Sequence, residues 1–378
     1  MFATAYKFIR FEKSKSTGIL LGIIISIYLI GLELGIFFYL TTLIGGVINN
    51  AKPEYAQVFV VNKLTNNANI LSPFDKRWVN QLRSIEGVDD THGMVLSTVS
   101  VRFDNGESSP AVIIGSEYPE LAAGPSEALL HTGSTNNLLL QGTVSTDFYD
   151  NKTFGYNIEQ GTQFEISGKN VTVGATTKNA KGFSSPMIYT TDATARYYSG
   201  FSEDMVSTVI VTVKDESKID HVIEQINAVA PDLRAWRSEK LNNATVINVM
   251  TANNMGMSFG TLVIFAIVSG FFIIGLTMYS ATYDRIKDYG TLKAIGATSH
   301  YITLLVMTQS FIYAVLGFAV SLILLIVTKF GMAKAGLIIS LSPQFLAFLF
   351  FVTLIIAVAS SMFSIQKLKK VEPSSVFR

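Results

Sequence analysis

The segment from residue 283 to residue 300, YDRIKDYGTLKAIGATSH, is a short polar stretch between two long apolar stretches. Arg285, Lys287 and Lys293 make it basic. The following Gly296-Ala297-Thr298 contains a glycine of the kind that ends helices. We predict a short basic amphipathic helix held between two membrane helices and able to push or be pushed by them. A simple polar turn is the alternative interpretation.

Four apolar stretches surround or precede this segment. A helix needs roughly 20 apolar residues to cross about 30 Å of hydrocarbon. The stretches over 18–48, 255–282, 301–328 and 341–365 meet that length. The whole chain is 49% apolar and 15% charged, whereas ordinary globular domains carry about 25% charged residues. We therefore expect an α-helical membrane protein with four transmembrane helices.

The first apolar stretch has basic residues before it, as a secretory signal does. Its apolar run is much longer than the roughly 7 to 15 residues of a signal core, and no small-residue cleavage site follows. A membrane helix that is retained is the favoured interpretation. Residues 1–17 before it interleave aromatic and basic side chains, which predicts a helix along the inner membrane surface.

The orientation follows from lysine and arginine, which concentrate on the cytoplasmic side of membrane proteins. Eleven of them lie before the first stretch, between the second and third, and after the fourth; the loop over 329–340 has two. This places both termini, including the tail over 366–378, and the 283–300 connection in the cytoplasm. The loop 329–340 and the long insert then lie outside. The location expected is the bacterial cytoplasmic (inner) membrane.

The insert over 49–254 has the pattern of a water-exposed α/β (α+β) domain. Strands are predicted over 57–61, 94–103, 111–114, 207–213 and 232–236, and helices over 75–85 and 218–229. Asp104-Asn105-Gly106 predicts a hairpin, because Asn-Gly supplies the positive φ of tight turns. Residues 117–200, with short strands over 164–166 and 171–173, predict a second, β-rich lobe inserted in the first. A helix over 242–254 is expected to continue into the second span as a rigid joint.

Glu33 is the charged residue within the first apolar stretch. An ionisable group at mid-membrane costs about 2.5 kcal/mol or more and often marks a pathway or site. Glu33 is therefore a candidate substrate-binding or proton-linked residue. The favoured alternative is a carboxyl that hydrogen-bonds a neighbouring helix at a group such as Gln309, Ser310 or Thr277.

Other kinds of site have little support. The G-x-x-x-x-G-K-[ST] phosphate loop is absent, so ATP chemistry has to come from another polypeptide. His221 and Glu224 have metal-ligand spacing on a predicted helix but no third ligand nearby. The net charge of +1 gives no basic face for nucleic acid, and the absence of cysteine excludes thiol chemistry. The sequence predicts no catalytic residue, no metal site and no enzyme activity.

Two segments resemble the permease subunits of MacB/FtsX-type ABC transporters. The run from Asp288 to Thr298, DYGTLKAIGAT, is similar to that family's E-x-G-x-L-x-A-[ILM]-G-A-[ST]. The closing VEPSSVFR from Val371 to Arg378 is similar to its terminal D-P-[AS]-x-x-[IVL]-[LF]-[RK]. The tyrosine in the first motif and the outer domain's size are most similar to the DevC and HrtB branch. The order of elements agrees over the whole chain, and the motifs cover its last 130 residues or so.

The resemblance implies a homodimeric permease with no cofactor of its own, bound to a separate cytoplasmic ABC ATPase that holds ATP and Mg. It implies a MacB-like periplasmic domain, with a periplasmic adaptor protein as a candidate further partner. The ATPase would dock on a coupling helix within 283–300. The docking residues that carry over are Arg285, Lys287, Tyr289, Gly290, Leu292, Lys293, Ala294, Ile295 and Gly296.

Three functions follow from these observations. The first is export or extraction of a hydrophobic or amphipathic substrate. The second is FtsX-like mechanotransmission, in which the outer domain regulates an extracytoplasmic partner without transport. The third is a membrane-anchored binding or sensing protein that needs no ATP.

Overall fold

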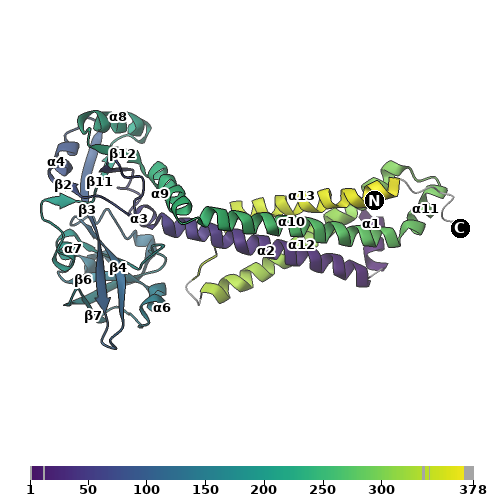
Figure 1. The fold of residues 1–378 in the computed structure, drawn as a ribbon, viewed down its shortest axis with the longest axis horizontal. Coiled ribbons are helices and arrows are strands. Elements are labelled where there is room, and N and C mark those ends of the chain that lie inside the picture. The colour runs from purple at the N-terminus through teal and green to yellow at the C-terminus, as the bar shows by residue number, and fades with distance from the viewer. Residues whose placement is uncertain (1, 12, 334–336, 340, 370–378) are drawn as a thin grey trace. The chain divides into compact units, whose positions relative to one another are not determined.

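The computed structural model describes residues 2–11, 13–333, 337–339 and 341–369. Its contacts divide the chain into two compact units (Figure 1). We call Leu40–Met255 the outer unit, and Met1–Tyr39 with Gly256–Arg378 the membrane unit. The predicted closing motif over 371–378 lies outside the described residues.

The outer unit is built on a ten-stranded sheet in the order β12-β1-β11-β3-β4-β9-β6-β8-β5, with β7 pairing β3 and β8. The pairs β4–β9 and β6–β8 are parallel and the others antiparallel. The strands are β1 (Val58–Asn62), β3 (Val88–Arg102), β4 (Ser108–Ser116), β5 (Leu130–Thr132), β6 (Thr143–Asp147), β7 (Gln163–Ile166), β8 (Lys169–Thr177), β9 (Met187–Thr191), β11 (Thr208–Val213) and β12 (Leu233–Arg237). A separate pair joins β2 (Phe74–Asp75) to β10 (Met205–Val206).

Helices cover this sheet and connect its strands. They are α3 (Gly46–Asn49), α4 (Arg77–Arg83), α5 (Thr135–Leu138), α6 (Asn151–Phe154), α7 (Asp192–Ser199), α8 (Ile219–Val229) and α9 (Ser238–Ala252). Short 3₁₀ turns occupy Glu127–Leu129, Phe148–Asp150 and Glu216–Lys218. The predicted strands and helices of the insert, apart from the length of the last helix, are therefore confirmed.

Alternation along the strands divides the core into two faces. Val58 and Val60 of β1 pack with residues of α4 and α8, whereas Phe59 and Val61 pack on the opposite face with Leu241 of α9. Successive side chains of a strand point to opposite faces, so both faces of β1 are covered. This explains why its residues from Val58 to Val61 are all apolar.

The segment predicted as a separate β-rich lobe, 117–200, joins the main sheet. Its strand β9 pairs in parallel with β4, and its strand β7 pairs with the end of β3. Its residues share one apolar cluster with β3, β4 and the residue after β3, as Phe164 and Tyr198 pack with Val101 and Phe103. Residues 117–200 thus add strands to one continuous sheet and share its core, rather than forming a sheet of their own.

The predicted β3–β4 hairpin is confirmed, but its turn differs from the expected one. Gly106 has φ +85°, while Asn105 is not in the left-handed region. Phe103 accepts a hydrogen bond from the amide of Gly106 and donates one to Glu107. This is a three-residue loop with glycine in the left-handed position, which is the next most common hairpin connection.

The expected continuous helix from 242 into the second span is wrong. The helix α9 ends at Ala252, and Asn254 has φ +53°. A left-handed residue cannot continue an α-helix, and asparagine adopts this conformation more readily than most residues. The next helix begins at Met255.

The membrane unit consists of long apolar helices and two short ones. They are α1 (Phe2–Phe11), α2 (Lys13–Ile44), α10 (Met255–Asp284), α11 (Ile286–Ala294), α12 (Ser299–Ala333) and α13 (Pro343–Lys369). Three described segments are long and apolar enough to cross a membrane: Ser16–Ile44, Met255–Asp284 and Ser299–Ala333. The described apolar part of α13, Pro343–Ala359, is shorter. A fourth crossing over 341–365 therefore stays a prediction.

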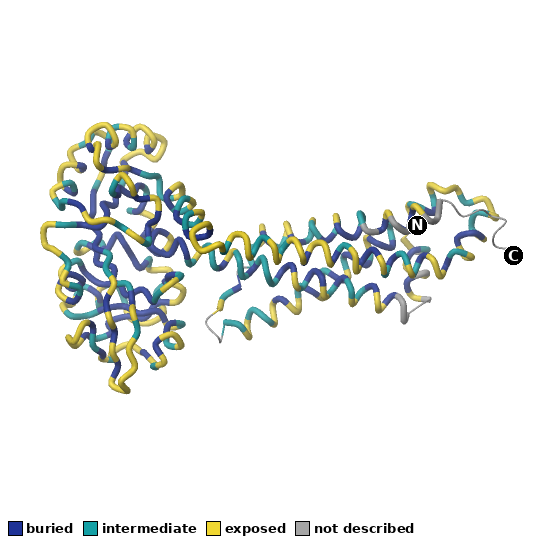
Figure 2. Tube along the Cα trace, viewed as in Figure 1, coloured by how far each residue is buried: buried dark blue, intermediate teal, exposed yellow. Residues whose placement is uncertain are grey.

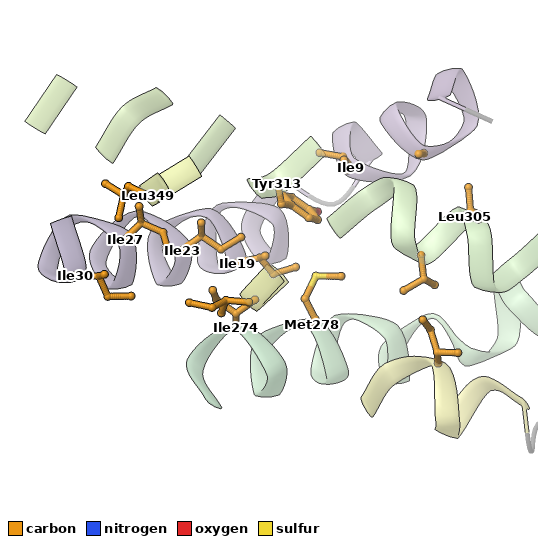
Figure 3. Close-up of a cluster of buried hydrophobic side chains, with 14 of the residues drawn as sticks. Ile9, Ile19, Ile23, Ile27, Ile30, Ile274, Met278, Leu305, Tyr313 and Leu349 are labelled. Atoms are coloured by element: carbon orange, nitrogen blue, oxygen red, sulfur yellow. The ribbon is translucent and has the colours of Figure 1, made fainter. Parts of the chain in front are cut away.

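The helices of the membrane unit bury one apolar stripe each. On α10 the buried residues Ala266, Gly270, Ile274 and Met278 recur every four positions, and Phe265, Phe272 and Leu276 beside them are exposed. Figure 2 shows the same alternation of buried and exposed residues along the helices. Figure 3 shows the buried side, where isoleucines of α2 lie near Ile274 and Met278 of α10 and Tyr313 of α12. Apolar faces left outside this core are typical of helices in lipid or against a partner.

Candidate functional site

The short helix α11 lies between two bends of the chain. After α10 ends at Asp284, Arg285 leaves helical geometry with φ −99° and ψ 16°. The carbonyl of Arg285 then accepts the first hydrogen bond of α11, from the amide of Tyr289, at 3.1 Å. The predicted helix in this segment is confirmed, and the polar turn is excluded.

The sequence Gly296-Ala297-Thr298 ends α11 and starts α12. Gly296 has φ +106°, its amide donates to the carbonyl of Lys293, and the amide of Ala297 donates to the carbonyl of Leu292. These two bonds form a Schellman motif, which normally has glycine at this position. The hydroxyl of Thr298 then accepts the amide of Tyr301 at 3.2 Å as the cap of α12. The predicted helix break is confirmed, and each of its three residues has a separate role.

Gly296 is the residue whose replacement tests this turn. No atom of the described residues lies within 4 Å of a Cβ built there, so it is the left-handed backbone that opposes a side chain. We expect Gly296→Ala to destabilise the α11–α12 turn by about 1 kcal/mol. Gly296→Asn should cost less, because asparagine tolerates this conformation. Hydrogen exchange of the α11 amides measures both variants, and equal protection in the two would contradict the assignment.

The inner side of α11 is anchored by a buried tyrosine. Tyr289 is 1% exposed, and its hydroxyl donates to Oε1 of Gln309 on α12 at 3.4 Å. Burial raises the pKa of Tyr289 to about 12, so the hydroxyl stays protonated at neutral pH and keeps its proton to donate. Ser16 of α2 bonds Tyr313 of α12 at 2.8 Å beside it. The Tyr289–Gln309 bond fixes one side of the short helix to α12, and the Ser16–Tyr313 bond joins α2 to α12 next to it.

The opposite side of α11 is open. Lys287, Ala294, Ile295 and Gly296 are exposed, and Ile295 is 80% exposed. The exposed residues of this short segment include an isoleucine and a lysine, and so offer an apolar group and a positive charge. Such a surface suits a protein partner with an apolar pocket and acidic residues.

The predicted docking residues therefore fall into three groups. Lys287, Ala294, Ile295 and Gly296 are exposed, whereas Leu292 and Lys293 are half-buried. The buried group consists of Arg285, Tyr289 and Gly290. Sequence reasoning missed Gln309 as an anchor of α11 and missed the neighbouring Ser16–Tyr313 bond, because no spacing rule connects these residues to α11.

Glu33 lies on α2 within the membrane unit. Its Oε2 is buried without a hydrogen-bond partner among the described residues. The three neighbours suggested for it bond elsewhere: Gln309 with Tyr289, and Ser310 and Thr277 with carbonyls of their own helices. Glu33 is thus a half-buried residue whose Oε2 is buried and has spare acceptor capacity.

At the C-terminal end of α2, which belongs to the outer unit, asparagine side chains bond the end of the helix and the segment after it to other parts of that unit. The amide of Asn50 donates to the carbonyl of Lys181 at 3.1 Å and to the hydroxyl of Tyr189 at 2.8 Å. Asn69 donates to the carbonyl of Ile44 at 2.8 Å. A Cβ at Gly45 would overlap the side chain of Asn242 on α9, so the two helices approach closely there. The end of α2, the segment after it and α9 are thereby held together.

Beside Asn50 lies a buried ion pair that should make stability depend on pH. Nζ of Lys181 is 3.0 Å from Oδ1 of Asp150, and Oδ2 of Asp150 has no partner among the described residues. Burial raises the pKa of Asp150 from 3.8 to about 6, despite the opposing charge of Lys181. A carboxyl with a raised pKa favours the folded state below about pH 4, and this contribution is lost as pH rises to about 6.

We expect this loss to reach about 3 kcal/mol, the free energy that corresponds to the rise in the pKa of Asp150. Asp150→Asn should remove that part of the pH dependence, so that wild type loses stability relative to the variant between pH 4 and 6. Urea unfolding of the full chain, followed by tryptophan fluorescence, measures it, because Trp78 and Trp236, the chain's two tryptophans, both lie in the outer unit. Parallel stability curves for the two proteins would exclude Asp150 as the source.

Among the described residues, no group of three His, Cys, Asp or Glu side chains could hold a metal ion. His221 instead bonds Gln225 on its own helix, with 3.2 Å between Nε2 of each. Glu224 and His221 therefore have no third ligand in the described part of the chain.

Comparison with known proteins identifies the C-terminal part of the chain. Residues 260–373 match the family model described as FtsX-like permease C-terminal. No curated protein matches the sequence.

Two solved structures are similar to about half of the chain. The extracellular domain of the ABC-type transporter YknZ from Gram-positive bacteria is 16% identical with a TM-score of 0.35, covering 48% of this chain and 99% of that one. The periplasmic region of MacB from Actinobacillus actinomycetemcomitans is 13% identical with a TM-score of 0.38, covering 52% and 93%.

The family match includes α11, the two bends around it and the helices that hold it. The described apolar helices indicate a membrane protein, and its residues 260–373 match the FtsX-like permease C-terminal domain.

Proposed function

We propose that this chain is the permease subunit of an ABC transporter, and that it couples ATP hydrolysis by a separate ATPase to export or extraction of a hydrophobic or amphipathic substrate. The observation that carries the proposal is α11 within an FtsX-like permease domain: a short helix fixed to α12 by Tyr289 and exposed at Ile295. The ATPase holds ATP and Mg and docks on this exposed side. The proposed complex contains two copies of each subunit, and a periplasmic adaptor protein is a possible further partner.

The proposed topology has four crossings and both termini in the cytoplasm. It is supported by the distribution of lysine and arginine, with eleven on the proposed inner side and two in the loop over 329–340. In this arrangement α11 faces the cytoplasm of a bacterial cell and the outer unit faces the exterior. Labelling of Lys287 or Lys293 by an impermeant amine reagent applied to intact cells would overturn it.

Motion has a route from the membrane helices to the outer unit in this proposal. The end of α2 and the helix α9 that precedes α10 are held together at Gly45 and Asn242. The segment after α2 is bonded to the sheet-bearing part through Asn50. A movement of these helix ends would therefore be passed to the strands around Tyr189.

Within the membrane unit, Glu33 is the proposed substrate-contacting residue. A buried carboxylate oxygen without a partner is costly, and a ligand or a second subunit that donates a hydrogen bond would remove that cost. We propose that the chain belongs to the DevC and HrtB branch of the family.

Mechanotransmission without transport is the second candidate, and the asparagine contacts at the end of α2 favour it equally. The experiment begins with co-expression of the chain with the ATPase of the neighbouring reading frame, followed by purification and reconstitution in liposomes. Copurification excludes the membrane-anchored sensor. ATP-dependent loss of haemin or of a fluorescent lipid from the liposomes supports transport, whereas ATP hydrolysis that neither probe alters, with neither being moved, would favour mechanotransmission.

A further inference from the structure

The outer unit has a large cavity where two parallel strands end. Strands β4 and β9 pair in parallel, with Ser116 opposite Thr191 at their carboxyl ends. The next residues along the two strands are Glu117 and Asp192, and both line the cavity. Ligands in α/β proteins commonly bind outside the carboxyl ends of such strands.

The cavity has the size and lining of a small-molecule site. Its volume is about 740 Å³, within the roughly 300 to 1,000 Å³ of known ligand pockets. Tyr118 and Tyr197 contribute largely exposed rings, and Leu139 adds an aliphatic side chain. Gln141 adds an amide on the same lining.

The charged groups that line the cavity are the two carboxyls. Oδ2 of Asp192 bonds Nε of Arg196 at 3.0 Å and Nζ of Lys76 at 3.4 Å. Oδ1 of the same carboxylate is buried and has no partner among the described residues. A buried acceptor without a donor is costly, so this oxygen favours a ligand that donates a hydrogen bond.

Glu117 is the less compensated of the two carboxyls. Burial raises its pKa, while a hydrogen bond from the backbone amide of Gly93 and the charges of Lys76 and His92 act in the opposite direction. The nearby charge of Asp192 raises the pKa further. A positive group in the cavity would relieve both the desolvation and the repulsion.

An aromatic ring at the cavity already holds a cation. Nζ of Lys169 lies 3.9 Å from the centre of the Tyr197 ring. The ring of Tyr118 is 67% exposed and is free to do the same for a ligand. Tyrosine rings attract ammonium groups through their negative faces.

We propose that this cavity binds a small organic cation, an ammonium group attached to an aromatic or apolar body. The ammonium group lies between Glu117 and Oδ1 of Asp192, and the body lies against Tyr118 and the aliphatic lining. An anion is disfavoured by the two carboxyls. A bare metal ion lacks a third ligand among the described side chains. The site is independent of the proposed transport, because binding here needs neither ATP nor the ATPase.

The test uses three probes that share an indole ring and differ in charge: tryptamine, tryptophol and indole-3-propionate. Their binding to the full chain in phosphatidylcholine nanodiscs is measured by saturation-transfer NMR at neutral pH. We expect tryptamine to bind about tenfold more tightly than neutral tryptophol, and indole-3-propionate to bind more weakly still. Equal binding of the three probes, or no binding of tryptamine, would overturn the proposal.

Variants locate the binding within the protein. Glu117→Gln should weaken tryptamine binding about tenfold and leave tryptophol binding unchanged. Glu203→Gln, at an exposed carboxyl outside the cavity lining, is the matched control and should have no effect. Asp192→Asn should act as Glu117→Gln does; because its loss also affects Lys76 and Arg196, tryptophan fluorescence must first show that the variant folds. If folded Glu117→Gln bound tryptamine as tightly as wild type does, the Glu117 carboxyl would not be part of the site and the assignment would be refuted.

Discussion

Ile295→Asp should detach the ATPase from the permease while leaving the membrane helices folded. Ile295 is 80% exposed directly after α11, so a charge there disturbs little of the packing among the described residues. In an interface, the same change places a carboxylate in an apolar pocket. Substitutions at central interface positions cost about 2 kcal/mol or more of binding free energy, so we expect the ATPase to bind roughly thirtyfold or more weakly.

The measurement is copurification of the ATPase with the tagged chain, together with ATPase activity in liposomes. Ile70→Asp, the same substitution at an exposed isoleucine of the outer unit, is the control and should leave association unchanged. Leu292→Asp is less informative, because Leu292 packs against the buried cluster of the membrane unit and its loss would weaken the fold as well. An ATPase that still binds the folded Ile295→Asp protein would contradict the docking surface.

The difference between Ile295 and Leu292 shows how far sequence could predict this site. The run from Asp288 to Thr298 predicts a helix and its end, because both depend on local chemistry: a left-handed glycine, a threonine cap and apolar spacing. Which side faces inward depends on Tyr289 meeting Gln309 on another helix. No local pattern contains that contact, so Arg285, Tyr289 and Gly290 could not be separated from Ile295 in advance.

In the outer unit, too, some features follow from local sequence and others depend on contacts between distant residues. The β-branched residues of β1 and β11 predict strands on their own, and Asn105-Gly106 predicts the hairpin. The parallel pairing of β4 with β9 joins residues more than seventy positions apart. The cavity between Glu117 and Asp192 exists only through that pairing, so sequence spacing gave no signal for it. The left-handed Asn254, which ends the expected joint, lies in a run of residues that otherwise favours a helix.

In the membrane unit, the contact between α2 and α12 at Gly317 is where we expect a larger side chain to destabilise the packing most. A Cβ at Gly317 would overlap Cγ2 of Ile23 and lie 3.0 Å from its Cβ. One turn further on, the hydroxyl of Ser321 donates to the carbonyl of Ile24 on α2 at 3.0 Å. Small residues four apart let membrane helices approach closely, and here they also permit a bond between helices.

Gly317→Val should therefore destabilise the membrane unit by about 1 to 3 kcal/mol, because α2 and α12 have to separate. Gly331→Val on the same helix is the matched control, because no atom of the described residues lies within 4 Å of a Cβ there. Unfolding in mixed detergent micelles, followed by circular dichroism, compares them. Ile23→Ala should recover part of the loss when combined with Gly317→Val, because it removes the methyl groups that overlap. Equal stability of the two valine variants would mean that α2 and α12 do not meet at Gly317.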